Sequence, residues 1–212
     1  MTRKLLLALL LFTVACSAAA QTTKNYNLVR LLKTNKLRID TGNHAQVIDV
    51  PGKRAIMLKN IAWLKDVSLK DGTIDVDLRG KDVFLQSFLG IAFHATDNTH
   101  YDVIYFRPFR FHHPDTATRK WSAQYMGMPG YDYDTLRKAH PGVYENYVNP
   151  VPGATDWFHA TIVLKGDWIT VYVDHSTVPS LKIQSLNTAR DGAIGLWADG
   201  LTEDFANLSI TR

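Results

Sequence analysis

Short runs in which apolar and polar residues alternate recur along most of this chain, and they restrict its fold more than any other feature. The clearest run, residues 73–79, carries Ile74, Val76 and Leu78 at every second position. Turn dipeptides such as Asp71-Gly72 bound these runs, and no amphipathic helical pattern separates them. Successive side chains of a strand point to opposite faces, so each run can cover a core with one face. The pattern predicts an all-β fold, an antiparallel β-sandwich.

The segment from Phe88 to Arg107 is expected to form a central hairpin with two chemically different faces. One face is apolar and should cover the core. The other carries His94, Tyr105 and Arg107, and Gln124 extends it on the following predicted strand. Because folding alone does not require these polar groups, we expect the functional surface on this face. The apolar set consists of Leu89, Ile91, Phe93, Ile104 and Phe106.

The first 20 residues have the pattern of a secretory signal peptide. Two basic residues precede the apolar run 5–14 and the small residues Ala18–Ala20. Cleavage there would export the protein to the periplasm or the extracellular space, and we expect residues 21–212 to form a single domain without disulfides. Cys16, the one cysteine of the chain, lies in an imperfect lipoprotein box, so lipid anchoring is the alternative.

The charge balance of the chain argues against several classes of partner. The precursor carries 24 Lys and Arg against 20 Asp and Glu, a formal net charge of +4, and its basic residues are scattered. We therefore expect no nucleic-acid interface. No run after the signal peptide is long and apolar enough to span a bilayer, and no pattern specifies an oligomeric state.

Six segments of the chain carry a family likeness. They are Asp71–Asp77, Phe88–Phe93, Trp157–Val163, Val171–Asp174, Gly195–Trp197 and Phe205–Leu208. In this order they resemble the concanavalin A-like lectin/glucanase superfamily, most closely its bacterial laminin-G-like and 3-keto-disaccharide hydrolase-like branches. The resemblance covers the chain from about Asp71 to Ile210. It implies a jelly roll of two curved sheets whose concave face often binds sugar.

The resemblance also bears on enzymatic activity, because the family-16 glucanases carry a catalytic Glu-x-Asp-x-x-Glu strand. The nearest match here is Asp75-x-Asp77, with Gly80 where the third carboxylate would be expected, which argues against a classical retaining glucanase. Asp75 and Asp77 share a strand face, with Cα atoms about 6.6 Å apart. Carboxyl groups at such separations can act as acid and base. The candidate catalytic residues are Asp75, Asp77 and His94.

The alternative for the two aspartates is structural. They can lie on a solvated strand face or form ion pairs with Arg79 or Arg107. For Arg107, an ion pair that staples the sheet and a direct contact with ligand remain equal alternatives.

Residues suited to sugar binding gather on the polar face of the hairpin and in the loop-rich segment 128–156. An arginine presents a fork of donors, and an aromatic ring packs on the apolar C–H face of a pyranose. The segment 128–156 is rich in tyrosine, which favours an ordered loop over a disordered one, with one helical turn expected near 135–138. The residues that we expect to contact a sugar are His94, Tyr105, Arg107, Gln124, Trp121 and Tyr131.

No motif indicates a cofactor or a metal site. His112 and His113 could be grouped with His94, His100 and Asp102, but adjacent residues of an extended segment point in opposite directions and do not chelate one ion. Calcium is possible in the superfamily that the chain resembles, but no dense Asp/Asn loop supports it here. We expect neither metal nor cofactor.

Three functions fit these patterns. The first is an exported, lectin-like domain that binds a carbohydrate on the concave sheet face. The second is an enzyme on the same scaffold, a glycoside hydrolase or a 3-keto-glycoside hydrolase or lyase. The third is a structural or interaction domain of the cell envelope without a sugar site.

Overall fold

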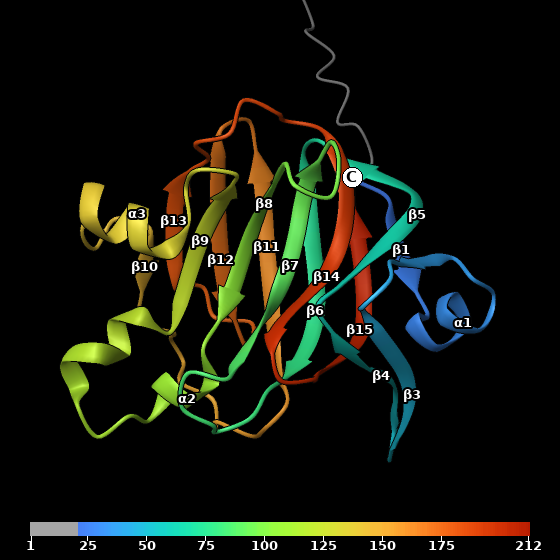
Figure 1. Cartoon of the computed structure of the whole chain (residues 1–212), viewed down its shortest axis with the longest axis horizontal. Helices are drawn as coiled ribbons and strands as arrows, with labels where there is room; N and C mark the ends of the chain where they lie inside the picture. The colour runs from blue at the N-terminus through green and yellow to red at the C-terminus, as the bar shows by residue number, and fades with distance from the viewer. Residues whose placement is uncertain (1–20) are drawn as a thin grey trace, which may run out of the picture.

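Two antiparallel β-sheets packed face to face form the body of the protein (Figure 1). The computed structural model describes residues 21–212. The predicted antiparallel sandwich is confirmed, whereas the predicted signal peptide and Cys16 lie outside the described residues. Within residues 21–212, no helix has the length and apolar character needed to cross a membrane.

One sheet, which we call the back sheet, contains eight strands. Their spatial order is β13 (Leu181–Gln184), β12 (Trp168–Val173), β11 (Phe158–Lys165), β6 (Gly72–Arg79), β15 (Glu203–Thr211), β4 (Lys53–Lys59) and β3 (His44–Val50), with β1 (Thr23–Tyr26) paired to β15.

The other sheet, which we call the front sheet, contains seven strands and faces the viewer in Figure 1. Their order is β10 (Glu145–Asn146), β9 (Ala123–Met128), β8 (Tyr101–Phe106), β7 (Ser87–Ala95), β14 (Gly192–Gly200), β5 (Ile61–Leu69) and β2 (Leu37–Ile39). The short helices are α1 (Leu28–Lys33), α2 (Pro108–Phe111) and α3 (Tyr133–Ala139), with a 3-10 helix, η1, at Thr116–Trp121.

The core lies between the sheets and is built from alternate residues of each strand. In the hairpin of β7 and β8, Leu89 pairs with Phe106 and Ile91 with Ile104, and all four side chains are fully buried. The Phe106 ring packs edge-on against Phe158 of the back sheet, with centroids 5.1 Å apart. Burial of each such side chain contributes about 1.5–3 kcal/mol. The predicted apolar face of the hairpin is confirmed.

A β-bulge near the end of β7 interrupts this alternation. The register with β14 shifts between Ala193 and Gly195, so β7 has one extra residue in this interval. His94 lies there with a φ of 52°, and its imidazole lies beside Asp102 on the inward face of the sheet. The prediction that His94 shares a face with Tyr105 is wrong, because a bulge redirects the side chains that follow it.

Candidate functional site

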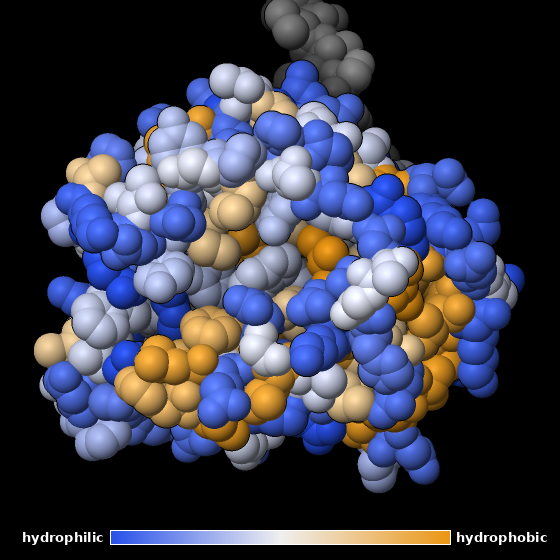
Figure 2. Space-filling model, viewed as in Figure 1, coloured by the Kyte–Doolittle hydropathy of each residue, from blue (hydrophilic) through white to orange (hydrophobic). Residues whose placement is uncertain are grey.

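The outer face of the front sheet is hollowed over its middle strands, as Figure 2 shows. The hollow, which we call the front cavity, has a volume of about 430 Å³. Its floor comes from β7, β8, β9 and β14, and α2, η1 and α3 supply its wall on one side. The residues that line it include the aromatic Phe88, Tyr105, Trp121, Tyr133 and Trp197 and the basic Arg107, Arg110 and Arg137.

A hydrogen-bonded group of three buried side chains lies at this floor: Tyr105 and Arg107 line the cavity, and Gln124 supports them without lining it. Tyr105 and Gln124 are register partners in β8 and β9, and the Tyr105 hydroxyl donates to Gln124 Oε1 at 3.1 Å. Arg107 Nη2 donates to both of these oxygens, and Nη1 donates to the Trp121 carbonyl at 2.7 Å. The structure therefore brings three of the predicted contact residues together.

The guanidinium of Arg107 is held among aromatic rings and neutral acceptors. Its carbon lies 4.7 Å from the centroid of the Tyr105 ring and 5.7 Å from that of Phe88. Burial raises the pKa of Tyr105 to about 12, so the phenol stays protonated at neutral pH. Burial lowers the pKa of Arg107, but a guanidinium is so strong a base that it stays charged in proteins. Of the two alternatives for Arg107, the ion pair with Asp75 or Asp77 does not form, because those aspartates belong to the back sheet.

Trp121 contributes its ring at the mouth of the cavity, where two further arginines pack on it. The guanidinium carbons of Arg110 and Arg137 lie 5.2 Å and 4.4 Å from the ring centroid. Arg137 also pairs with Glu145, and the shortest contact, from Nη2 to Oε2, is 2.6 Å. The cation–π contacts fix the arginines in place without neutralising them.

The second predicted loop aromatic, Tyr131, does not line the front cavity. It exchanges two backbone hydrogen bonds with Gly127, at 3.1 and 2.9 Å, which hold it at the far end of β9. Tyr133, at the start of α3, lines the wall of the cavity instead.

Several residues that line the cavity were not predicted from the sequence. Phe88 and Trp197 could have been found, since each alternates with buried apolar neighbours in its strand. Arg110, Arg137 and Asp199 carry no such signal, because they lie in short helices or at a strand end.

His94 belongs to a buried network on the other side of the front sheet. Its Nδ1 lies 3.0 Å from Asp102 Oδ2, and the Tyr125 hydroxyl donates to Asp102 Oδ1 at 2.7 Å. Ser185 and Asn187 donate to the same carboxylate, each at 2.9 Å. Asp102 is fully buried and surrounded by donors, so this group stabilises the core, and it lies apart from the residues that line the front cavity.

Asp75 and Asp77 do share a strand face, but it is the outer face of the back sheet. His159 of β11 lies between them, with Nδ1 2.8 Å from Asp77 and Nε2 3.2 Å from Asp75. Both hydrogen bonds raise the pKa of His159 to about 9. Burial opposes ionisation of Asp77, but hydrogen bonds from His159, Lys53 and Asn207 outweigh it and lower the pKa to about 2.

This arrangement overturns the expected partners of the two aspartates. Neither lies near His94 or Arg107, and Arg79 pairs instead with Asp204, with Nη2 2.7 Å from Oδ2. A carboxyl group with a lowered pKa stays ionised and is a poor general acid.

The described residues also give no metal centre, since no group of three or more His, Cys, Asp or Glu side chains within 21–212 could hold an ion. His112 Nε2 lies 2.9 Å from the carbonyl oxygen of Pro152, while His113 Nδ1 accepts from the Asp115 amide. The two adjacent histidines therefore have separate partners.

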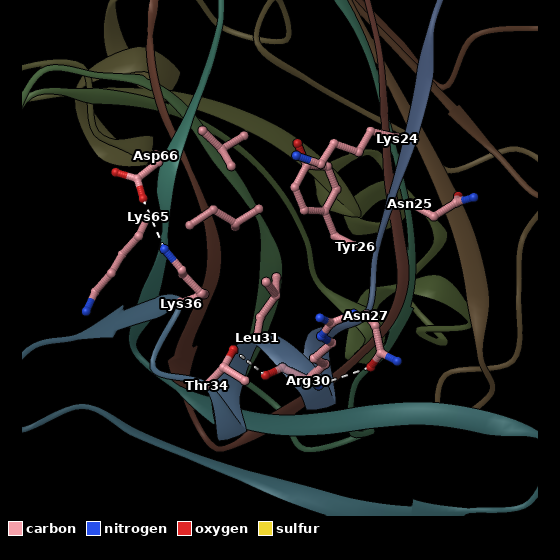
Figure 3. Close-up of a pocket in the computed structure, with 12 residues that line it drawn as sticks. Lys24, Asn25, Tyr26, Asn27, Arg30, Leu31, Thr34, Lys36, Lys65 and Asp66 are labelled. Carbon is pink, nitrogen blue, oxygen red and sulfur yellow. Dashed lines mark hydrogen bonds and ion pairs between the residues drawn. The ribbon is translucent and has the colours of Figure 1, made fainter.

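A second cavity, of about 510 Å³, lies between the N-terminal segment and β5 (Figure 3). Lys24, Arg30, Lys36 and Lys65 line it together with Asp66. Lys36 Nζ lies 3.5 Å from Asp66, but these side chains are 57% and 85% exposed, so water screens their charges. The front cavity instead holds cations that are buried and fixed, which makes it the candidate site.

Comparisons with known proteins identify the fold. No family model and no curated protein matches the sequence. Among solved structures, the carbohydrate-binding module CBM66 from Bacillus subtilis aligns with a TM-score of 0.54 and 13% identity, over 79% of this chain and 94% of its own. A protein of unknown function with a galectin-like fold, also from Bacillus subtilis, has a TM-score of 0.57 and 10% identity over 88% and 94%. The fold is a concanavalin A-like jelly roll.

A third structure agrees with this assignment. A proposed glycosyl hydrolase from Parabacteroides distasonis aligns with a TM-score of 0.56 and 13% identity, over 89% of this chain and 98% of its own. The two-sheet jelly roll that the resemblance implied is thus confirmed. In this concanavalin A-like sandwich the front cavity opens on the outer face of the seven-stranded sheet.

Proposed function

We propose that this protein binds a carbohydrate in the front cavity. The observation that carries the proposal is that aromatic rings and fixed polar groups line the same hollow: Trp121 and Trp197 beside Tyr105 and Arg107. Rings pack on the C–H face of a sugar while fixed donors and acceptors take its hydroxyls. The volume of about 430 Å³ falls within the range of about 300–1,000 Å³ usual for small-molecule sites.

Two further points support a carbohydrate ligand. The solved structures with a similar fold include a carbohydrate-binding module and a proposed glycosyl hydrolase. The predicted signal peptide agrees with a glycan ligand outside the cytoplasm, and we place the protein in the periplasm or the extracellular space.

The lining of the cavity favours binding over hydrolysis. Glycoside hydrolysis generally uses two carboxyl groups on opposite sides of the scissile bond. Among the described residues that line the front cavity, Asp199 is the one carboxylate. Glu145 is buried and paired with Arg137, and the predicted pair Asp75 and Asp77 lies on the other sheet.

A glycan array combined with a hydrolysis screen tests the proposal. We expect the protein to bind one class of glycan without releasing products, and Trp197→Ala to weaken that binding at least tenfold. Trp168→Ala is the matched control, because Trp168 is an exposed tryptophan on the back sheet, 45% accessible. Release of products would favour the enzyme alternative, whereas equal losses in both variants or no binding at all would reject the front cavity as a sugar site.

A further inference from the structure

Two arginines of the front cavity are buried without a carboxylate partner among the described residues. Arg107 is 5% exposed, and its acceptors are a hydroxyl, an amide oxygen and a backbone carbonyl. Arg110 is 7% exposed, and its Nη1 donates to the Thr118 hydroxyl at 2.8 Å. Its Nε is buried and has no acceptor within residues 21–212. Buried charges in proteins are ordinarily paired, because an unpaired one carries a large desolvation cost.

A third guanidinium adds to the positive charge. Burial is the main cause of the lowered pKa of Arg107, and the nearby charges of Arg137 and Arg110 act in the same direction. The Glu145 carboxylate accepts hydrogen bonds from Nε and Nη2 of Arg137, which leaves Nη1 for another partner. With its side chain 31% exposed, Arg137 is the most accessible of the three. Among the described residues that line the cavity there are thus three cations and a single carboxylate, that of Asp199.

Aromatic contacts explain how the site tolerates this charge. The Arg110 guanidinium carbon lies 4.8 Å from the Phe84 ring and 5.6 Å from the Phe109 ring, in addition to its contact with Trp121. Cation–π contacts offset part of the desolvation cost, and they hold the planar groups in fixed positions. A fixed guanidinium is preorganised for a carboxylate, which it can bind through two parallel hydrogen bonds.

We propose that the ligand of the front cavity is an acidic sugar, a uronic acid residue whose carboxylate is bound by the cluster of Arg107, Arg110 and Arg137. This inference rests on the proposed function and adds a specificity to it. The sugar ring would contact Trp197 and Tyr105, and the carboxylate would supply the negative charge that the cluster lacks. The cavity is a poor match for a neutral glycan, since Arg107 and Arg110 would then stay without a counter-charge.

Titration with paired ligands tests the inference. Oligosaccharides of galacturonic, glucuronic and mannuronic acid are each compared with their own methyl esters, which keep the sugar but remove the charge. We expect at least one free acid to bind ten or more times more tightly than its ester, with a preference that shrinks as salt is raised. Arg110→Gln and Arg137→Gln should each reduce the preference at least threefold. Lys65→Gln, which removes a cation from the second cavity, should leave it unchanged.

The outcomes separate the two proposals. If neutral glycans bind and no acid is preferred, the acidic-sugar inference is overturned while the carbohydrate-binding function stands. If neither acids, esters nor neutral glycans bind, both fail. A preference that is lost in Lys65→Gln but kept in both arginine variants would place the acid in the second cavity and also overturn the inference. Arg110→Lys controls for a folding defect. It keeps the positive charge, so it should keep more of the preference for the acid than Arg110→Gln does.

Discussion

Gln124 lies directly opposite Tyr105 in the ladder between β8 and β9, and its side-chain oxygen accepts from both the Tyr105 hydroxyl and Arg107. One neutral acceptor therefore holds a phenol and a buried cation in the floor of the front cavity. Two variants at this position separate its structural role from its effect on the charge of the cavity.

Gln124→Ala should destabilise the protein by about 2–3 kcal/mol, because it leaves two buried donors without their shared acceptor. Urea unfolding, followed by tryptophan fluorescence, measures the loss. The control is Gln46→Ala, which removes an exposed glutamine from β3 and should change stability by less than about 0.5 kcal/mol. A loss equal to that of the control would contradict the role assigned to Gln124.

Gln124→Glu keeps the shape of the side chain but places a carboxylate beside Arg107. This internal counter-charge should make the variant more stable than Gln124→Ala and reduce its preference for acidic sugars at least threefold. The free acid and its methyl ester are titrated against the variant as described above. An undiminished preference would show that Arg107 does not contribute to it.

His94→Gln should destabilise the core and leave sugar binding unchanged. The substitution weakens the network around Asp102, with an expected cost of about 1–3 kcal/mol. The affinity of His94→Gln for the glycan that the unmodified protein binds most tightly should change by less than about twofold, since the front sheet separates His94 from the cavity. Loss of affinity at unchanged stability would restore the ligand contact expected from the sequence.

The back-sheet cluster should give the protein a stability that depends on pH. The pKa of His159 is raised from 6.5 to about 9, so its contribution is complete below pH 6.5 and is lost as the pH rises through 9. The pKa of Asp77 is lowered from 3.8 to about 2, so its contribution is complete above pH 3.8 and is lost as the pH falls through 2.

His159→Ala should therefore flatten the decline in stability between pH 6.5 and 9. Because the His159 side chain is 19% exposed and partly screened, we expect it to account for about 1–2 kcal/mol. Thermal unfolding across this range measures the effect. His44→Ala, which removes an exposed histidine from β3, should keep the slope of the unmodified protein.

Glu203 should oppose folding at alkaline pH. It is fully buried, and burial raises its pKa from 4.5 to about 7. Its contribution is complete below pH 4.5 and is lost as the pH rises through 7, by at most about 3 kcal/mol. Glu203→Gln removes the ionisation, so it should unfold at a higher temperature than the unmodified protein at pH 8. If the unfolding temperatures of the variant and the unmodified protein differed by the same amount at pH 4 and at pH 8, this assignment would be contradicted.

The sequence predicted those parts of the fold that depend on regular alternation. Ile74, Val76 and Leu78 are inward, and Tyr105, Arg107 and Gln124 share one face, because β6, β8 and β9 keep a period of two over these positions. The expected helical turn near 135–138 is confirmed as part of α3.

The remaining errors have separate physical causes. The face of His94 was predicted wrongly, because the bulge that turns this residue inward, with its positive φ, has no clear signal in the surrounding sequence. Asp75 and Asp77 were placed correctly with respect to each other, but alternation cannot say which sheet a strand joins. Arg110 and Arg137 were missed because they reach the cavity from short helices that fold back over the sheet.

The placement of these two arginines separates the charge of the front cavity from the pairing of the strands. Arg110 and Arg137 are carried by α2 and α3, which lie outside the strand ladders that close the core. Substitutions in these helices can alter the charge that a ligand meets while every backbone pairing of the sandwich is kept. If the front cavity binds the acidic sugar proposed above, such a scaffold can acquire new glycan preferences by small steps, and exchange of two short segments would retune its selectivity.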